Sequence, residues 1–84
     1  MKVGILTARK VLFEGEAAEV VLPAEDGEMS VLDFHQPCIC RLGKGQIKVS
    51  GTGRSDGKGN LAFPVRLGVA WAGVQSLTVL VEDA

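Results

Sequence analysis

Eighty-four residues allow a single domain with a thin hydrophobic core. Hydrophobic residues make up 46% of the chain and the formal net charge is −1, which excludes a disordered chain and gives no electrostatic reason to bind nucleic acid. No apolar run approaches the ~20 residues that a spanning helix needs, so we expect no direct membrane insertion. The N-terminus lacks the apolar region and cleavage site of a signal peptide, which indicates an intracellular protein.

The first half of the chain alternates apolar and polar residues with a period of two, which is typical of strands and not of amphipathic helices. Asp26-Gly27, flanked by apolar runs, predicts a hairpin turn because glycine tolerates the positive φ of a tight turn. We expect residues 14–16 to break the second strand and Pro23 to end the third. The strands expected here are 1–7, 11–13, 17–22 and 28–32.

The second half continues the same pattern. A glycine-rich loop over residues 51–60 is expected to join two strands as a mobile hairpin loop, and Pro64 predicts an edge strand or a bulge because proline cannot donate to a ladder. No segment offers a crossover helix, so we expect antiparallel pairing throughout. Strand signals every 8–12 residues predict an all-β sandwich or barrel. The strands expected here are 38–42, 46–50, 61–67, 69–71 and 77–81.

Cys38 and Cys40 share one face of a predicted strand, near the ~7 Å limit on Cα separation and poorly oriented for a disulfide. We interpret both as small core residues. Together with His35 they offer three zinc ligands where structural zinc needs four, and a Cys–His nucleophile pair would lack an orienting group. We therefore expect no metal, no cofactor and no catalytic residue. A small metal or thiol enzyme that uses these three side chains remains the alternative.

The carboxylates of Glu25, Asp26 and Glu28 cluster at the predicted turn. Solvent would keep them ionised, whereas general acid catalysis needs a pKa raised by burial. They are either solvated turn charges or a contact surface for a partner. The glycine-rich loop differs from a phosphate-binding loop, because Gly57-Lys58 is followed by a strand pattern and not by a helix.

Four motifs and the final strand together resemble the epsilon subunit of F-type ATP synthases. The resemblance covers essentially the whole chain, in the right order and spacing, and the turn followed by a histidine and a proline is its most specific part. The matching stretches are T-x-x-x-V-L-F-E-G (7–15), V-V-L-P-A-E-D-G-E-M-S-V-L (20–32), H-Q-P (35–37), L-G-K-G-Q-I (42–47) and L-T-V-L-V-E-D-A (77–84).

The resemblance implies that residues 1–84 form one epsilon-type domain, a two-sheet antiparallel β-sandwich of about ten short strands. It implies a non-catalytic central-stalk (rotor) subunit that binds the gamma subunit, rests on the c-ring and helps to couple ion translocation to ATP synthesis. Such a subunit is peripheral, at the cytoplasmic face of the inner membrane. By position, Glu25, Asp26 and Glu28 would face the polar loops of the c-ring, and the sides near Thr7 and His35 would face gamma.

The sequence also departs from the family pattern. Family members commonly carry a two-helix C-terminal hairpin, which we expect to be absent here because the sequence ends at Ala84; we therefore expect no inhibitory insertion into the catalytic head and no nucleotide site. A generic β-sandwich interaction module unrelated to ATP synthase is the alternative function. Without gamma, an exposed apolar contact face predicts weak self-association. The departures in usual proline or glycine positions are Ala8, Ala24, Ser30, Asp33-Phe34 and Leu67.

Overall fold

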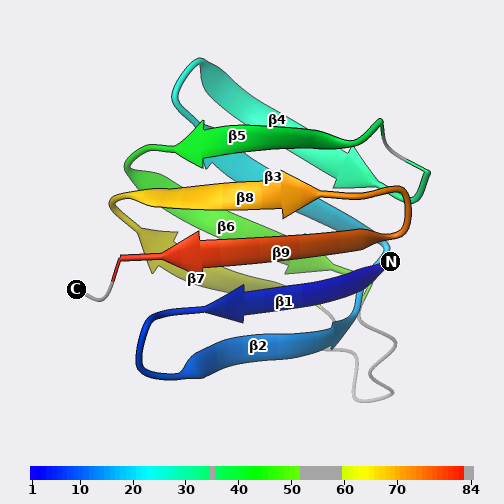
Figure 1. The fold of residues 1–84 in the computed structure, drawn as a ribbon, viewed down its shortest axis with the longest axis horizontal. Coiled ribbons are helices and arrows are strands. Elements are labelled where there is room, and N and C mark those ends of the chain that lie inside the picture. The colour runs from blue at the N-terminus through cyan, green and yellow to red at the C-terminus, as the bar shows by residue number, and fades with distance from the viewer. Residues whose placement is uncertain (35, 52–59, 83–84) are drawn as a thin grey trace.

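The computed structural model of the chain describes residues 1–34, 36–51 and 60–82. Within these ranges the chain forms nine strands and no helix (Figure 1). The expected all-β class is therefore confirmed. The strands are β1 (Lys2–Leu6), β2 (Val11–Glu16), β3 (Glu19–Ala24), β4 (Gly27–Leu32), β5 (Cys38–Leu42), β6 (Gly45–Ser50), β7 (Leu61–Val65), β8 (Gly68–Ala72) and β9 (Ser76–Val81).

The strands lie in two layers (Figure 1). The front layer has the order β2-β1-β9-β8-β5, and the back layer contains β3, β6 and β7 with β4 beside β3. One bridge between Ala24 and Leu42 joins β3 to β5, so hydrogen bonds connect all nine described strands in one curled sheet. The predicted sandwich is right in its layering, but its two sheets are not separate.

One predicted feature of the pairing is wrong. β1 and β9 run parallel over their full lengths, with Lys2 opposite Ser76 and Leu6 opposite Leu80. The prediction assumed that parallel neighbours need a crossover helix between them. Here the rest of the domain is the connection, because the two strands are the first and the last of the chain. The other paired strands of the described residues are antiparallel.

Two expected strand breaks are also wrong. β2 continues to Glu16, because β1 pairs with it up to the Lys2–Glu16 position. Pro23 lies inside β3 opposite Glu28, and its carbonyl accepts a hydrogen bond from the Gly43 backbone at 2.8 Å. Tertiary pairing thus overrides these local breakers. The expectation for Pro64 is confirmed, since β7 ends the path of paired strands and is an edge strand.

The hairpin between β3 and β4 is confirmed, with the loop one residue earlier than expected. Glu25 and Asp26 form the turn, and Ala24 pairs with Gly27. Gly27 has φ +126°, a conformation that L-residues rarely adopt. The Asp26-Gly27 pair therefore predicts the turn correctly, because it contains the glycine that adopts the positive φ. Most of the expected glycine-rich loop, residues 52–59, lies outside the described residues.

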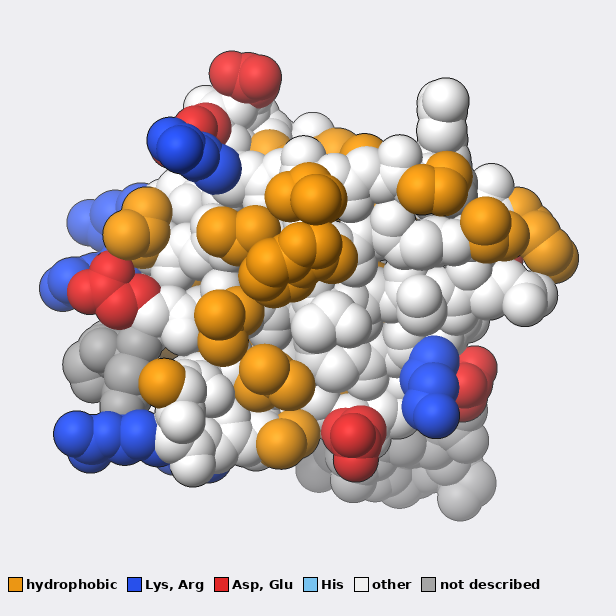
Figure 2. Space-filling view, viewed as in Figure 1, with side chains coloured by type: hydrophobic (Ala, Val, Ile, Leu, Met, Phe, Trp, Pro, Cys, Tyr) orange, Lys and Arg blue, Asp and Glu red, His pale blue; other side chains and the backbone are white. Residues whose placement is uncertain are grey.

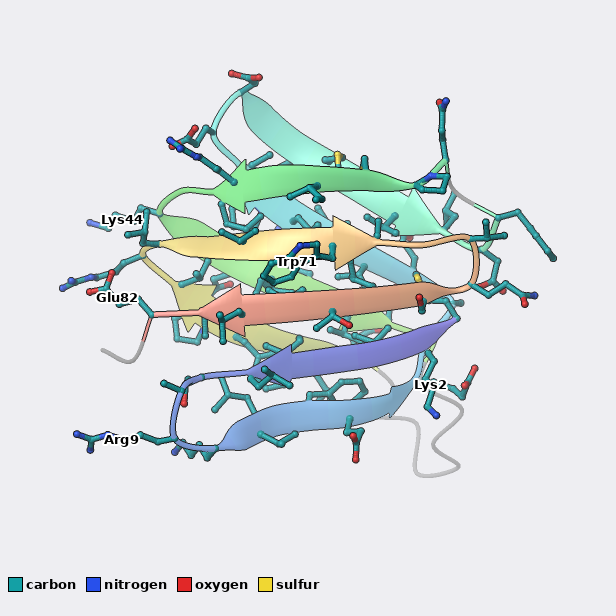
Figure 3. The ribbon with its side chains drawn as sticks, in the orientation of Figure 1. Lys2, Arg9, Lys44, Trp71 and Glu82 are labelled. Carbon is teal, nitrogen blue, oxygen red and sulfur yellow. The ribbon has the colours of Figure 1, made fainter. Side chains whose placement is uncertain are left out.

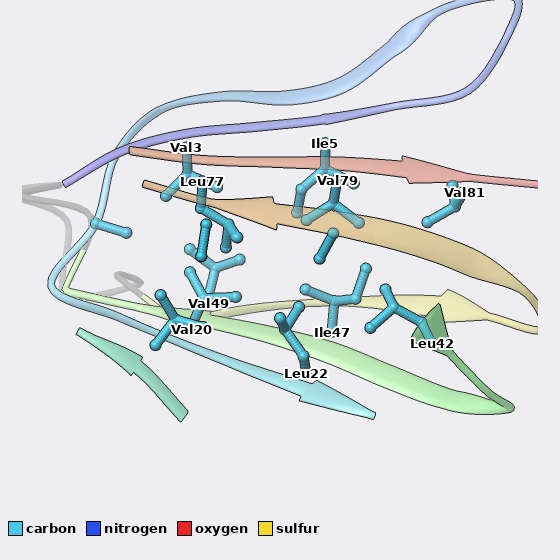
Figure 4. Close-up of a cluster of buried hydrophobic side chains, with 14 of the residues drawn as sticks. Val3, Ile5, Val20, Leu22, Leu42, Ile47, Val49, Leu77, Val79 and Val81 are labelled. Atoms are coloured by element: carbon cyan, nitrogen blue, oxygen red, sulfur yellow. The ribbon is translucent and has the colours of Figure 1, made fainter. Parts of the chain in front are cut away.

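The core lies between the two layers (Figure 4). Inward-facing side chains alternate along each strand, as the period-two pattern predicts. Full burial of each Val, Leu or Ile contributes about 1.5–3 kcal/mol. The largest side chains with less than 2% exposure are Ile5, Leu22, Leu42, Ile47, Leu77, Val3, Val20, Val31, Val49 and Val79.

The strand registers place distant turns together at the two ends of the sandwich. We name these the Thr7 end and the Met1 end. At the Thr7 end, Leu6 lies opposite Leu80, Gly68 opposite Val81 and Leu42, and Leu42 opposite Ala24. The β1–β2 turn, the acidic turn at Glu25 and Asp26, the start of β8 and the end of β9 therefore lie at one end of the molecule (Figure 1).

At the Met1 end, backbone hydrogen bonds connect the N-terminus to other loops. The Lys2 nitrogen donates to the Gln75 carbonyl at 2.9 Å, and the Phe34 nitrogen donates to the Val74 carbonyl at 2.6 Å. The turn between β8 and β9 and the loop after β4 therefore share this end.

Candidate interaction surfaces

The acidic turn is held from two sides. Its residues Glu25 and Asp26 connect β3 to β4, and the Glu25 backbone nitrogen donates to the Arg41 carbonyl on β5 at 3.2 Å. Both side chains are exposed. The turn therefore presents two carboxylates from a backbone that is fixed by both layers.

Glu28 lies apart from this tip, on β4. Its carboxylate is 3.6 Å from the Lys48 ammonium, and the two side chains are 66% and 57% exposed. An ion pair this exposed contributes only about 0–1 kcal/mol. The structure thus brings two of the three predicted c-ring contacts together, whereas Glu28 faces outward from the back layer beside a lysine. That pair is weak enough for a partner's charge to replace it.

Thr7 is 8% exposed, and its hydroxyl shapes the β1–β2 turn. Its Oγ1 accepts hydrogen bonds from the backbone nitrogens of Arg9 and Lys10, each at 3.1 Å. The Thr7 nitrogen donates to the Lys10 carbonyl at 2.8 Å. A partner near Thr7 would therefore meet its exposed neighbours, such as Ala8, more than the threonine itself.

The other predicted gamma contact, His35, lies outside the described residues. Its neighbour Phe34 is 73% exposed and lies at the Met1 end, where it bonds to Val74. The Thr7 turn is at the opposite end of the front layer. The structure therefore does not bring the Thr7 turn and Phe34 together.

The outer face of the front layer carries an apolar row that the sequence analysis missed. Val69, Leu80, Leu6 and Val11 lie opposite one another across β8, β9, β1 and β2. Figure 2 shows hydrophobic side chains gathered across this face. The sequence carried only a weak signal, because the outward set of the 77–81 segment contains one apolar residue, Leu80, beside Thr78.

Two larger side chains extend this row. Ile39 on β5 and Trp71 on β8 are direct partners across the two strands. They are 69% and 42% exposed, and Figure 3 shows Trp71 on the outer side of β8. Exposed apolar side chains that adjoin one another mark interaction surfaces more often than single ones do. We name the four-residue row together with Ile39 and Trp71 the apolar face.

A hollow of ≈ 560 Å³ opens at the Thr7 end of the apolar face. Leu67, Val69 and Leu80 supply much of its apolar lining. Gly68 lies between them, and a Cβ at this position would stand 2.8 Å from the Leu80 carbonyl oxygen. Glycine is therefore required for the close approach of β8 to β9 beside the hollow.

Charged residues also line the hollow. Glu25, Arg41 and Glu82 contribute to it, and Glu82 forms an ion pair with Arg66 at 3.5 Å. The hollow thus adjoins the acidic turn through Glu25 and the β1–β2 turn through Ala8.

The two cysteines are free thiols on the inward side of β5 and pack against the core. Burial, and to a smaller degree the nearby Cys38, raises the pKa of the Cys40 thiol. A raised pKa lowers the fraction of reactive thiolate. This environment supports the interpretation of both residues as packing groups. No cluster of three His, Cys, Asp or Glu side chains able to hold a metal occurs among the described residues.

The described part of the chain includes no helix that is long and apolar enough to cross a membrane.

The fold and its surfaces define a β-sandwich domain with two candidate contact surfaces, the acidic turn and the apolar face. The fold is shared with chains in two solved assemblies, at 17% and 18% sequence identity. One is the central stalk and c-ring of the Tetrahymena thermophila mitochondrial ATP synthase (TM-score 0.77, covering 99% of this chain and 63% of that one). The other is the Euglena gracilis mitochondrial ATP synthase (TM-score 0.80, 94% and 48%).

Sequence comparison identifies the family. The model of the ATP synthase delta/epsilon chain β-sandwich domain matches residues 1–84, and the chain belongs to this family. The ATP synthase epsilon chain of Bordetella bronchiseptica is 36% identical over all of this chain and 57% of its own length. The chloroplastic epsilon chain of Chlamydomonas reinhardtii is 32% identical over all of this chain and 60% of its own. The epsilon chain of Janthinobacterium sp. is 38% identical over 67% of this chain and 40% of its own. The chain thus spans 40% to 60% of the length of these relatives.

Proposed function

We propose that this chain is the β-sandwich domain of a non-catalytic central-stalk subunit of an F-type ATP synthase. It binds the gamma subunit and the c-ring and helps to couple ion translocation to ATP synthesis. The observation that carries the proposal is the family match over residues 1–84. The fold shared with a chain of a solved central stalk and c-ring supports it. The working position is peripheral, at the cytoplasmic face of the inner membrane.

The acidic turn is the proposed contact with the c-ring. Glu25 and Asp26 are exposed at its tip, and Glu28 follows on β4. Exposed charges at the edge of an interface steer docking and set its register more than they add affinity. These carboxylates therefore suit a surface that must dock against polar loops in one orientation.

The proposed gamma contact involves the sides near Thr7 and His35. Thr7 and Phe34, the neighbour of His35, lie at opposite ends of the front layer. Five residues of β1 separate these ends by about 17 Å at the usual rise of a strand. A partner that reaches both sides must therefore extend along the length of this layer.

The proposal is tested in membrane vesicles from a strain whose copy of this gene is deleted and then restored. Restoring the chain is expected to restore ATP-driven ion uptake, because coupling needs the central stalk. The triple variant Glu25→Gln, Asp26→Asn, Glu28→Gln should restore less of it. Glu14→Gln, an exposed carboxylate on β2, is the matched control and should behave as the wild type. Equal ion uptake with and without the chain would contradict the proposal.

A further inference from the structure

Three sulfur-containing side chains face the interior of the sandwich from two different strands. Cys38 and Cys40 lie on the inward side of β5, and Met29 lies on β4 directly opposite Leu22 of β3. Leu22 has no exposure, and directly opposed residues of paired strands share a face of the sheet, so Met29 also faces inward. All three side chains pack against the core. Both layers therefore contribute sulfur to the interior.

The strand registers place Met29 level with Cys40. A bridge between Ala24 and Leu42 joins β3 to β5, and Ala24 also pairs with Gly27 at the start of β4. Cys40 lies two residues from Leu42 and Met29 two residues from Gly27, so both are equally far from this junction of the layers. β4 and β5 lie on the same side of the sandwich (Figure 1). Packed layers lie about 10 Å apart, and Met29 enters this gap from the side opposite to Cys40.

The two thiols are close to each other but poorly placed for a disulfide. Two residues along a strand advance about 6.6–6.8 Å, whereas a disulfide needs its sulfurs ~2.05 Å apart. Burial is the larger cause that raises the pKa of Cys40, and the nearby Cys38 is the other, so the two thiols lie within electrostatic range. A metal ion bridges a wider gap, because two metal–sulfur bonds of about 2.3 Å span up to about 4.6 Å. Rotation of the two side chains about χ1 brings their sulfurs toward this separation.

The chemistry of the three sulfurs selects the kind of metal. Thiolate and thioether sulfur prefer soft ions such as Cu⁺, whereas Mg²⁺ and Ca²⁺ prefer oxygen and structural Zn²⁺ takes four ligands. Cu⁺ and its redox-inert analogue Ag⁺ accept two or three sulfur ligands, which is the number available here. All three side chains are partly exposed, so an ion can reach the sulfurs from solvent.

We propose that Met29, Cys38 and Cys40 form a binding site for a soft monovalent metal ion, Cu⁺ or Ag⁺, where β4 and β5 lie on one side of the sandwich. Both thiols release their protons to solvent. The two thiolates, the thioether and the ion then form a complex with one negative charge, and no group is oxidised or reduced. The sequence analysis considered His35 as the third ligand beside the cysteines, whereas the fold supplies a third sulfur from the other layer. The inference goes beyond the proposed function and does not depend on it.

A bound ion would link the two layers beside the acidic turn. Met29 lies on the strand that follows this turn, and Cys40 precedes Arg41, whose carbonyl accepts the hydrogen bond from the Glu25 nitrogen at 3.2 Å. The ion therefore adds a cross-link to the backbone hydrogen bonds that hold the turn. Because the folded chain brings the three sulfurs together, binding should stabilise the folded state.

The first test measures binding of Cu⁺ to the purified chain under anaerobic conditions, with the ion supplied from a chelator of known affinity. One ion per chain is expected, and free ion at a hundred times Kd should raise Tm by roughly 10 °C or more. Cys38→Ala and Cys40→Ala each remove a ligand, and each should weaken binding roughly a hundredfold or more, since even supporting residues around a metal cost 10–100-fold.

Two further variants examine the thioether and the specificity of the effect. Met29→Leu keeps a similar volume but removes the sulfur, so it should weaken Cu⁺ binding roughly tenfold while the metal-free domain stays folded. Ser30→Ala is the matched control, because Ser30 is the exposed neighbour of Met29 on β4. It should bind Cu⁺ as the wild type does.

Methionine methyl resonances locate the third ligand without any substitution. The chain has two methionines, and Met1 is a buried core residue at the N-terminus, which makes it an internal control for Met29. In the wild type labelled with ¹³C at the methionine methyl groups, Ag⁺ should shift the Met29 signal and leave the Met1 signal in place. This readout does not depend on how well the cysteine variants fold.

The outcomes decide the proposal. One ion per chain, weaker binding by both cysteine variants and a shifted Met29 signal support the three-sulfur site. Wild-type affinity for Cu⁺ in either cysteine variant, or an unshifted Met29 signal at saturating Ag⁺, would overturn it. A single ion held between two chains, seen as a metal-dependent dimer by native mass spectrometry, would also overturn it.

Discussion

The N-terminal ammonium of Met1 is a structural group of this fold, and removing its carboxylate partner should destabilise the domain. The ammonium is enclosed, with 1% exposure of its residue's side chain, and lies 2.7 Å from Asp33 Oδ1. It also donates to the Ala17 carbonyl at 2.8 Å. Asp33→Ala removes a charge-assisted hydrogen bond and leaves the ammonium with the Ala17 carbonyl and a Glu16 carboxylate 3.7 Å away.

The expected cost is about 0.5–1.5 kcal/mol, because the Asp33 carboxylate is 47% exposed and solvent weakens its interaction with the ammonium. For a domain of this size, each kcal/mol lowers Tm by roughly 4–8 °C. Thermal unfolding at pH 7 measures the change. Asp26→Ala is the control, because Asp26 is an exposed turn residue, and its Tm should stay within a few degrees of the wild type.

The pH dependence of the stability tests whether the ion pair between the Met1 ammonium and Asp33 causes the destabilisation. The hydrogen bond from the ammonium to Asp33 is the largest cause that raises the pKa of the Met1 ammonium above its ordinary value of 8.0, against the opposing effect of burial. A raised folded-state pKa means that the stabilisation is complete below pH 8.0 and is lost as the pH rises through the folded value. Wild-type stability should therefore fall above pH 8, and Asp33→Ala should show a smaller fall. An equal fall in both proteins, or an unchanged Tm in the variant, would refute this reasoning.

Three further predictions follow from the packing. Leu22→Ala, at a site with no exposure, should lower the free energy of unfolding by about 2–5 kcal/mol in urea titrations, whereas Leu32→Ala, at a half-exposed site, should cost far less. Gly68→Ala should be destabilising, since its Cβ would lie 2.8 Å from the Leu80 oxygen; an unchanged urea midpoint would contradict that geometry. Thr7→Val keeps the side-chain shape but removes the hydroxyl that accepts two backbone hydrogen bonds, so it should cost about 1–3 kcal/mol, with Thr78→Val as the exposed control.

The strands themselves could be predicted from the sequence, because one side of each strand faces the core. Residues 38–42 and 77–81 alternate in the way that their burial later shows, and Gly27 marks the hairpin through its backbone conformation. These are local effects of the pleat and of φ, which the sequence carries directly.

The errors come from long-range pairing. Pro23 disfavours a strand, and so does the segment 14–16. Pairing with β4 keeps Pro23 extended, and pairing with β1 keeps residues 14–16 extended. The parallel pairing of β1 with β9 involves the two ends of the chain, so no local pattern could indicate it. The contact between the Met1 ammonium and Asp33 also joins residues that are far apart in the sequence.

The candidate site was predictable only in part. The exposed carboxylates of the acidic turn were found because a turn tip is solvated whatever the tertiary fold. The apolar face was missed, since it appears only when β8, β9, β1 and β2 are placed in register. The separation of Thr7 from Phe34 also depends on this register, and no sequence spacing contains it.

The most direct test of the account is co-purification of this chain with the gamma subunit encoded in the same genome, by size-exclusion chromatography at moderate salt. The account predicts co-elution at a one-to-one ratio. Clean separation of the two folded proteins would contradict it and leave a β-sandwich interaction module whose partner lies outside the ATP synthase.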